Sequence, residues 1–226
     1  PIYIDEEGKW YKYTKKIEEI GTIEVGDKLA EIEKLDDPMN YLKQMDCIFP
    51  VLHGLYGEDG TIQGLFELLK VPYVGCKVLA SSVCMDKVYA KIIFEKAGLN
   101  QAKYVYIRKD KEKFRYIEEN FEESVCTLEE VSKKTEEKLE YPMFVKPSNS
   151  GSSVGVKKAN DVNELKLAIE NASKYDRKII IEEGIKGKEV ECAILEKKDE
   201  IIASTVGEIK SAEEFYSFDA KYNIPN

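Results

Sequence analysis

One apolar run constrains the fold class of this chain more than any other feature. Residues Cys47 to Leu52 read CIFPVL, and an uninterrupted apolar run of this kind is typical of a strand buried on both faces of a parallel sheet. The following GEDGTIQGLFELLKVPYVG predicts a turn, a short helix and a second strand. Strand, loop, helix and strand in this order indicate an α/β fold.

Two later segments carry helix signals at their ends. Asp86 precedes KVYAKIIFEKA and Gly98 follows it, which predicts an N-capped helix that ends at a glycine. Asp161 precedes VNELKLAIENA, with Glu164 three residues further on as in a capping box. The charged stretch between these segments, Lys109 to Glu140, predicts one or two surface helices with loops.

Strand-like runs dominate the second half of the sequence. The stretch YPMFVKPSNSGSSVGVKK, Tyr141 to Lys158, places an apolar run, a Ser/Gly/Asn loop and a second β-like run in succession. Further strands are predicted at Lys178 to Glu182, Glu189 to Leu195 and Ile201 to Val206. The turn KKDE predicts that the last two form a hairpin.

Composition excludes several classes of function. The formal net charge of −9 argues against a general nucleic-acid binder, which needs a basic surface. The sequence has no apolar run long enough to span a membrane and shows no secretion leader, so we expect a soluble protein with no membrane partner.

Cysteine and histidine usage narrows the chemistry. The five cysteines form no Cys-x-x-Cys pair, so neither a disulfide framework nor a zinc site is indicated, and reduced thiols in the cytoplasm are expected. His53 is the only histidine, which excludes a multi-histidine metal site. Chemistry in this chain therefore depends on Lys, Ser, Tyr and carboxylates.

The loop after Lys146 is the first candidate site. Its Ser, Gly and Asn residues would present backbone N–H groups and hydroxyls beside one fixed positive charge, which is what a phosphate needs. The same residues are ordinary turn formers, so an ordinary surface hairpin is the alternative explanation.

Other candidates also have two readings. Glu182 and Glu189 flank a glycine-containing linker, where they could accept hydrogen bonds from a base and a ribose or be solvated edge-strand charges. His53 follows the predicted buried strand, at the end where α/β sheets bind ligands, or has a structural role. Lys87 lies in the first turn of a helix, unfavourable for a cation unless an anion binds there, although a solvated lysine is common.

Five segments in one order make a family resemblance specific. They are HGLYGEDGTIQG from His53, MDK from Met85, VKPSNSGSSVG from Val145, IEEGIKGKEVECAIL from Ile181 and FDAKY from Phe218. Together they resemble the D-alanine–D-alanine ligases of the ATP-grasp superfamily. The resemblance implies an α/β ATP-grasp fold preceded by a Rossmann-like domain, incomplete at both termini. We expect part of an N-terminal domain at residues 1–75, a nucleotide-covering domain at 76–184 and the first part of a C-terminal domain at 185–226.

The resemblance also implies roles for residues around the nucleotide. Lys87 and Lys146 would contact ATP phosphates. Glu182 would meet adenine together with the backbone of Glu183 and Ile185, while Glu189 would hold the ribose.

Four further residues are implied on the substrate side. Ser152 and Tyr222 would help to order the first D-alanine, and His53 would lie beside the substrate amino acids. Lys221 would reach the terminal phosphate when a lid closes. A lid tyrosine such as Tyr222 accompanies dipeptide formation in the family, which favours an amine nucleophile over D-lactate.

The implied reaction joins two D-alanines for peptidoglycan precursor synthesis. ATP phosphorylates one carboxylate, and the amine of the second D-alanine attacks the acylphosphate; lysines offset the gathering charge. Alternatives are a D-alanine–D-serine ligase, another ATP-grasp carboxylate–amine ligase, or a non-catalytic ATP-binding protein with this fold.

The resemblance leaves parts of the family pattern outside this sequence. A glycine-rich first element would precede Pro1, and the ligands for two Mg²⁺ ions would follow Asn226, so no metal ligand is expected within the 226 residues. We therefore expect these residues alone to be inactive. Family members are commonly homodimers, which is the assembly that the resemblance implies.

Overall fold

The computed structural model describes residues 1–16, 19, 31–198 and 200–209. Within these residues the chain divides into two compact units, Pro1–Val51 with Ile62–Lys77, and Leu52–Thr61 with the residues from Val78 onward. No helix in the described part combines the length and apolarity needed to cross a bilayer.

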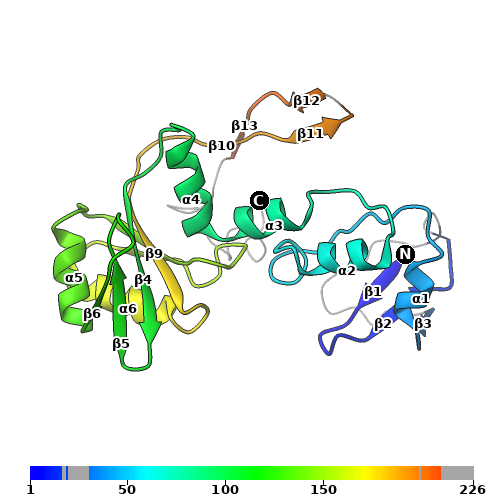
Figure 1. Cartoon of the computed structure of the whole chain (residues 1–226), viewed down its shortest axis with the longest axis horizontal. Coiled ribbons are helices and arrows are strands. Elements are labelled where there is room, and N and C mark those ends of the chain that lie inside the picture. Colours follow the sequence, from blue (N-terminus) through cyan, green and yellow to red (C-terminus); the bar gives the residue numbers. More distant parts are fainter. Residues whose placement is uncertain (17–18, 20–30, 199, 210–226) are drawn as a thin grey trace. The chain divides into compact units, whose positions relative to one another are not determined.

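The first unit pairs a small antiparallel sheet with two helices, blue to cyan in Figure 1. Its elements are β1 (Ile2–Ile4), β2 (Trp10–Tyr13), β3 (Ile32–Lys34), α1 (Pro38–Leu42) and α2 (Thr61–Leu69). The buried residues Leu42, Ile62 and Phe66 form its core. The helix predicted after GEDG is therefore confirmed as α2.

The buried strand predicted at Cys47 to Leu52 is wrong. This segment makes only an isolated parallel bridge, between Ile48 and Tyr73, among the described residues. Phe49 and Val51 remain 71% and 69% exposed. A continuous apolar run becomes a central strand only when neighbouring strands satisfy both of its edges, and a single bridge does not do this. His53 consequently follows a segment without regular secondary structure and not a buried strand.

The second unit is built on a six-stranded antiparallel sheet in the order β6-β5-β4-β9-β7-β8 within the described residues. Its strands are β4 (Tyr104–Asp110), β5 (Lys113–Ile117), β6 (Glu123–Cys126), β7 (Met143–Pro147), β8 (Lys157–Ala159) and β9 (Lys178–Glu183). Its helices are α3 (Val78–Met85), α4 (Lys87–Lys96), α5 (Leu128–Glu136) and α6 (Val162–Ala172). Helices α5 and α6 contact each other and cover one face of this sheet, where the main core lies.

Helix ends follow the predicted caps. The Asp86 carboxylate accepts hydrogen bonds from the backbone at the start of α4, and Gly98, at φ 72°, follows the last turn. Asp161 caps α6 in the same way, and the apolar face of α6 is buried. Four short strands end the described chain: β10 (Glu189–Glu191), β11 (Ile194–Lys197), β12 (Glu200–Ala203) and β13 (Gly207–Ile209).

The hairpin predicted at the turn KKDE is confirmed as the pair β11–β12. The boundaries predicted for its two strands are wrong. The run from Glu189 to Leu195 divides into β10 and β11, and β10 pairs with β13. The run from Ile201 to Val206 ends early, at Ala203. Each strand ends where the chain passes from one partner strand to another. The pattern of residue types does not predict such a change of partner.

The prediction of surface helices from Lys109 to Glu140 is wrong for its first half. Strands β5 and β6 occupy Lys113 to Cys126, and only α5 is helical. Phe114 and Tyr116 point into the core while charged residues alternate with them along β5. Those outward charges dominate the composition, although their spacing is that of a half-buried strand.

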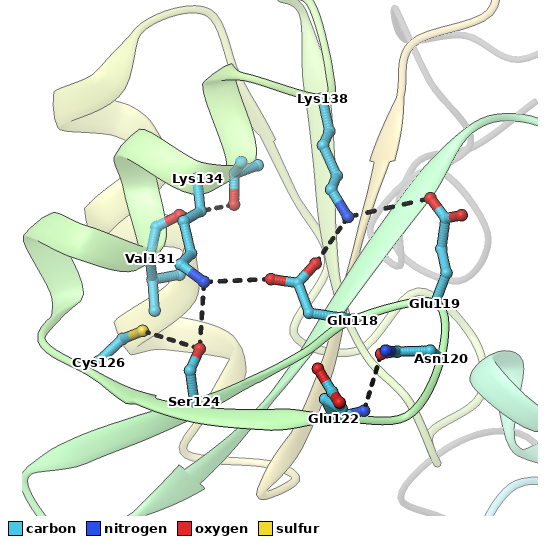
Figure 2. Close-up of polar contacts among 10 residues, drawn as sticks. Glu118, Glu119, Asn120, Glu122, Ser124, Cys126, Val131, Lys134 and Lys138 are labelled. Carbon is cyan, nitrogen blue, oxygen red and sulfur yellow. Dashed lines mark hydrogen bonds and ion pairs between the residues drawn. The ribbon is translucent and has the colours of Figure 1, made fainter.

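Two lysines, Lys134 in α5 and Lys138 just after it, connect the helix to the hairpin of β5 and β6 (Figure 2). Glu118 accepts a hydrogen bond from Lys134 at 3.1 Å and from Lys138 at 2.9 Å, and Lys134 also donates to Ser124 at 3.1 Å. Both lysine ammoniums lie over the Tyr116 ring, at 4.9 and 5.8 Å from its centroid. The ion pairs therefore cover an aromatic side chain that belongs to the core.

Tyr116 is fully buried, yet its hydroxyl has no hydrogen-bond partner among the described residues. A buried unsatisfied hydroxyl costs free energy, so Tyr116→Phe should raise the free energy of unfolding by about 1 kcal/mol while keeping the ring under the lysines. Urea unfolding followed by circular dichroism measures the change. Tyr141→Phe is the matched control, because the Tyr141 hydroxyl donates to Glu136 at 3.0 Å; it should not stabilise the protein. A loss of stability in Tyr116→Phe would contradict the prediction.

Candidate functional site

Alternation along the strands divides their side chains between the two faces of the large sheet. Ile179 and Ile181 of β9 belong to the core under α5 and α6, so Glu182 points to the opposite face. Val145 of β7 lies in the same core, which places Lys146 on the face of Glu182. Two of the predicted site residues therefore meet on the face of the sheet that α5 and α6 leave uncovered.

Glu182 is the centre of this polar face. One carboxylate oxygen pairs with Lys146, and the other lies 2.8 Å from Nζ of Lys91 on α4. The Glu182 side chain is only 10% exposed. Burial alone would raise the pKa of its carboxyl, but the ammonium groups of Lys146 and Lys91 outweigh burial and hold the pKa below its ordinary value. Glu182 is consequently an ionised acceptor between two cations.

Lys87 comes to the same region from the first turn of α4. Its Nζ donates to the carbonyl of Ser150 at 2.6 Å and lies 3.4 Å from that of Ser148, so backbone oxygens of the serine loop hold it. Among the described residues it makes no ion pair with a carboxylate. Burial, together with the nearby Lys146 ammonium, lowers the pKa of Lys87 to about 8. Two cations that repel each other in a half-buried place fit an anionic ligand.

A second carboxylate fixes the start of α4 against the serine loop. Asp86 accepts hydrogen bonds from the Ser148 hydroxyl at 2.6 Å and from Lys178 Nζ at 2.5 Å, in addition to capping the helix. The Lys178 ammonium also lies 4.0 Å from the centroid of the Tyr89 ring. Burial would raise the pKa of Asp86, but Lys178 and Ser148 outweigh it and lower the pKa. This network determines where Lys87, the next residue, can point.

The serine loop connects β7 to β8, which pair as antiparallel neighbours. It is thus a hairpin connection, as one reading of its composition predicted, and its phosphate role stays a prediction. Ser152 and Ser153 adopt positive φ values of 50° and 59°, which serines rarely do. At Gly155, with φ of 75°, a Cβ would lie 2.6 Å from Tyr175 and 2.7 Å from Pro147, so only glycine fits there. The loop is therefore pinned at its end while its serines hold a strained backbone.

The histidine motif lies beside this loop. A Cβ on Gly151 would come within 3.5 Å of the Gly54 Cα, which places the residue after His53 against the serine segment. Glu58 accepts a hydrogen bond from the Gly54 N–H at 2.6 Å, and Asp59 accepts two from backbone N–H groups of the same turn and the start of α2. Glu58 and Asp59 therefore hold the turn that follows His53 and the start of α2.

Two family descriptions match this chain. "D-ala D-ala ligase N-terminus" matches residues 1–76, and "D-ala D-ala ligase C-terminus" matches residues 93–226. The chain belongs to the D-alanine–D-alanine ligase family. The resemblance read from the five motifs is confirmed.

Known members of the D-alanine–D-alanine ligase family are longer than this chain. The D-alanine–D-alanine ligase of Acetivibrio thermocellus is 48% identical over 98% of this chain and 62% of its own length. That of Clostridium acetobutylicum is 44% identical over 98% of the chain and 61% of its own length. The chain thus spans about three fifths of the curated relatives that it matches.

Solved structures of ligases share the fold. VanG D-Ala:D-Ser ligase from Enterococcus faecalis superposes with a TM-score of 0.74 at 34% identity, covering 99% of this chain and 63% of that one. The D-alanine-D-alanine ligase from Coxiella burnetii gives a TM-score of 0.68 at 28% identity, covering 92% and 57%. The expected α/β ATP-grasp fold is confirmed.

The other residues with an implied nucleotide role are less closely grouped. The Glu183 carboxylate accepts a hydrogen bond from the Lys103 N–H at 2.8 Å, so its side chain is engaged in joining β9 to the chain before β4. Ile185 is 69% exposed, and Glu189 begins the exposed strand β10. The roles proposed for these three residues in this D-alanine–D-alanine ligase family member stay predictions.

Lys221 and Tyr222, the predicted lid residues, lie outside the described residues. Among the residues that are described, no group of three or more His, Cys, Asp or Glu side chains could hold a metal ion. No step of the chemistry is assigned to a metal in the described part.

Sequence reasoning missed two lysines of this site. Lys178 holds Asp86, and Lys91 holds Glu182. A signal existed for Lys91, which follows Lys87 by four residues on a predicted helix and so shares its face. Lys178 offered none, because its partner lies 92 residues away in the sequence.

The lowered pKa of Lys87 predicts a pH dependence for anion binding. A phosphate group favours the charged ammonium, whereas in the free protein Lys87 loses its proton near pH 8. Nucleotide affinity should therefore be unaffected by this group below pH 8 and should fall about tenfold per pH unit above it. Titration calorimetry of the full-length protein with ATP measures this. In Lys87→Arg, which stays charged, ATP affinity should no longer fall above pH 8. If affinity still falls in this variant, another group causes the pH dependence.

Proposed function

We propose that the full-length protein is an ATP-dependent, ADP-forming ligase that joins two D-alanines for peptidoglycan precursor synthesis. The observation that carries this proposal is the meeting of Lys87, Lys146 and Glu182 on one face of the sheet in a D-alanine–D-alanine ligase family member. Named relatives at 48% and 44% identity support the same activity.

The residues present fit a nucleotide. Lys87 and Lys146 would favour phosphates there, since Lys87 makes no ion pair among the described residues and Lys146 shares Glu182 with Lys91. ATP would supply the phosphoryl group that activates the first D-alanine carboxylate as an acylphosphate. Glu182 would accept a hydrogen bond from the adenine amine, with the backbone of Glu183 and Ile185 alongside and Glu189 at the ribose.

The protein's own part in the chemistry is to position, to offset charge and to exclude water. Lysine ammoniums favour the charge distribution of phosphoryl transfer without taking part in bond making. The pinned serine loop, with Ser152 and the neighbouring His53 segment, would close one side of the substrate site. We propose that Lys221 and Tyr222 close it further, which protects the acylphosphate from hydrolysis.

The remaining expectations belong to the full-length protein. We propose that it works in the cytoplasm as a homodimer, with Mg²⁺, two ions in all, bound by residues outside those described here. The domain division at residues 75 and 184 and the inactivity of the 226-residue chain by itself stay predictions.

A substrate screen tests the function. Full-length protein with Mg-ATP should release ADP and form the dipeptide with D-alanine, and L-alanine should be inert. D-Serine as the second substrate deserves a parallel assay, because VanG D-Ala:D-Ser ligase is among the structural neighbours. ATP binding without ADP release in the presence of any amino acid would support a non-catalytic ATP-binding protein, and a different amine acceptor would support another carboxylate–amine ligase.

A further inference from the structure

Lys91 lies in the site without an assigned role. Its side chain is 13% exposed, and its Nζ lies 2.8 Å from Oε1 of Glu182. Three other groups hold it in place: the Ala102 carbonyl accepts a hydrogen bond from Nζ at 3.1 Å, the Tyr104 ring centroid lies 5.1 Å away, and Gln101 donates to the Lys91 carbonyl at 2.9 Å. Lys91 is therefore a fixed partner of the carboxylate.

Lys146 is bound to the other carboxylate oxygen in a different way. Its side chain is 28% exposed, and its second described neighbour is the Phe144 ring, 5.9 Å from Nζ. A lysine that is more exposed and has one strong partner can leave that partner at a lower cost in free energy than a lysine held by several groups. Of the two lysines paired with Glu182, Lys146 is therefore the one that could move from the carboxylate to a phosphate.

We propose that Lys91 is a positioning residue for the nucleotide base, which holds Oε1 of Glu182 so that Oε2 is free to accept a hydrogen bond from the adenine amine once Lys146 has turned to the phosphates. This inference rests on the proposed function. A 6-oxo purine presents an oxygen where adenine presents its amine, so an ionised Glu182 faces it with two acceptors and repels it. Lys91 therefore determines the preference for adenine.

The charges around Glu182 explain why Lys91 is needed for this. Lys91 and Lys87 face it from α4 and Lys146 from β7, while Tyr104 is its partner on β4. With Lys146 shared by phosphates and Lys91 removed, burial would favour the protonated carboxyl. A protonated Glu182 can donate to the oxygen of a 6-oxo purine, so discrimination is lost.

Binding of ATP and inosine triphosphate by the full-length protein tests the proposal, because their bases differ at the position that Glu182 reads. The unmodified protein should prefer ATP by about a hundredfold, as expected for a hydrogen bond to a charged group. Lys91→Met should reduce this ratio at least tenfold. It should also make ATP affinity fall as the pH decreases, because Glu182 without Lys91 takes up a proton more readily. Lys91→Arg should restore both the ratio and the flat pH profile.

A merely structural role for Lys91 gives a different result. Both nucleotides would then weaken alike in Lys91→Met, with the ratio and pH profile unchanged, and this outcome overturns the inference alone. Lys96→Met, a charge loss at an exposed position of the same helix, is the matched control, and a similar change in its ratio also overturns it. If the unmodified protein does not bind ATP, the proposed function fails and this inference fails with it. Thermal unfolding by circular dichroism confirms that each variant is folded.

Discussion

Replacing Lys146 by methionine in the full-length protein should weaken ATP binding on the order of a hundredfold and remove measurable ligation. A charge-assisted hydrogen bond to a phosphate contributes roughly 1.5–3 kcal/mol, and its loss alone accounts for a tenfold to hundredfold effect. The chemical step loses more, because a group that offsets charge acts most strongly in the transition state. Calorimetry gives the affinity, and single-turnover ADP release gives the rate of the chemical step.

The effect should not come from a general loss of positive charge. Lys157→Met is the matched control, since Lys157 is exposed on β8 opposite Val145, whose side chain lies in the core on the other face of the sheet from Lys146. It removes the same charge and should leave affinity and rate within about twofold. Retention of near-normal ligation by Lys146→Met would reject the phosphate role of Lys146, and an equal loss in Lys157→Met would show that the effect is not local.

The second large effect is expected at Asp86. Asp86→Ala should lower the free energy of unfolding by roughly 3–5 kcal/mol, because it removes a helix cap and leaves Lys178 and the buried Ser148 hydroxyl without their acceptor. The Lys178 side chain is 22% exposed and that of Asp86 13%, so water replaces the lost partner only in part. Urea unfolding at neutral pH, followed by circular dichroism, measures the change.

A serine variant separates the two contributions of Asp86. Asp86→Ser keeps an N-cap oxygen but not the charge, so it should recover about 1 kcal/mol of the loss. Equal stabilities of the alanine and serine variants would reject the capping contribution, and a loss below about 1 kcal/mol in alanine would reject the buried network.

The network at Asp86 also predicts the sign of a pH dependence. Because its pKa in the folded protein is lowered, its stabilising contribution is complete above its ordinary value of 3.8 and is lost as the pH falls through the lowered pKa. The difference in stability between the unmodified protein and Asp86→Ala should therefore be constant from about pH 5 to 8 and narrow only under more acidic conditions. Narrowing already at neutral pH would contradict the lowered pKa.

Local signals in the sequence predicted the elements whose determinants are local. The caps at Asp86 and Asp161 and the hairpin of β11 and β12 depend on residues within a few positions of one another, and all were found. The run at Cys47 was misread because burial depends on which strands flank it. The strands β5 and β6 were missed because outward charges concealed a period of two.

The candidate site divides in a similar way. Lys87, Lys146 and Glu182 could be named from motifs, and the structure brings them together. Lys91 and Lys178 belong to the same region through contacts made only after α4 packs on the sheet; the spacing from Lys87 gives a local signal for Lys91, and Lys178 has none. Sequence motifs therefore identified the three central residues of the candidate site better than the residues that hold them in place.

The alternation along β9 has a consequence for how this protein can change over generations. Ile179 and Ile181 serve the core under α5 and α6, while Lys178 and Glu182 point to the opposite face, where the buried Ile180 lies between them. Pressure to keep the chain folded and pressure to keep its ligand chemistry thus act on adjacent residues of one six-residue strand. A shift of the strand by one residue would exchange the two sets at once, so variation here must proceed by single replacement and cannot proceed by insertion or deletion.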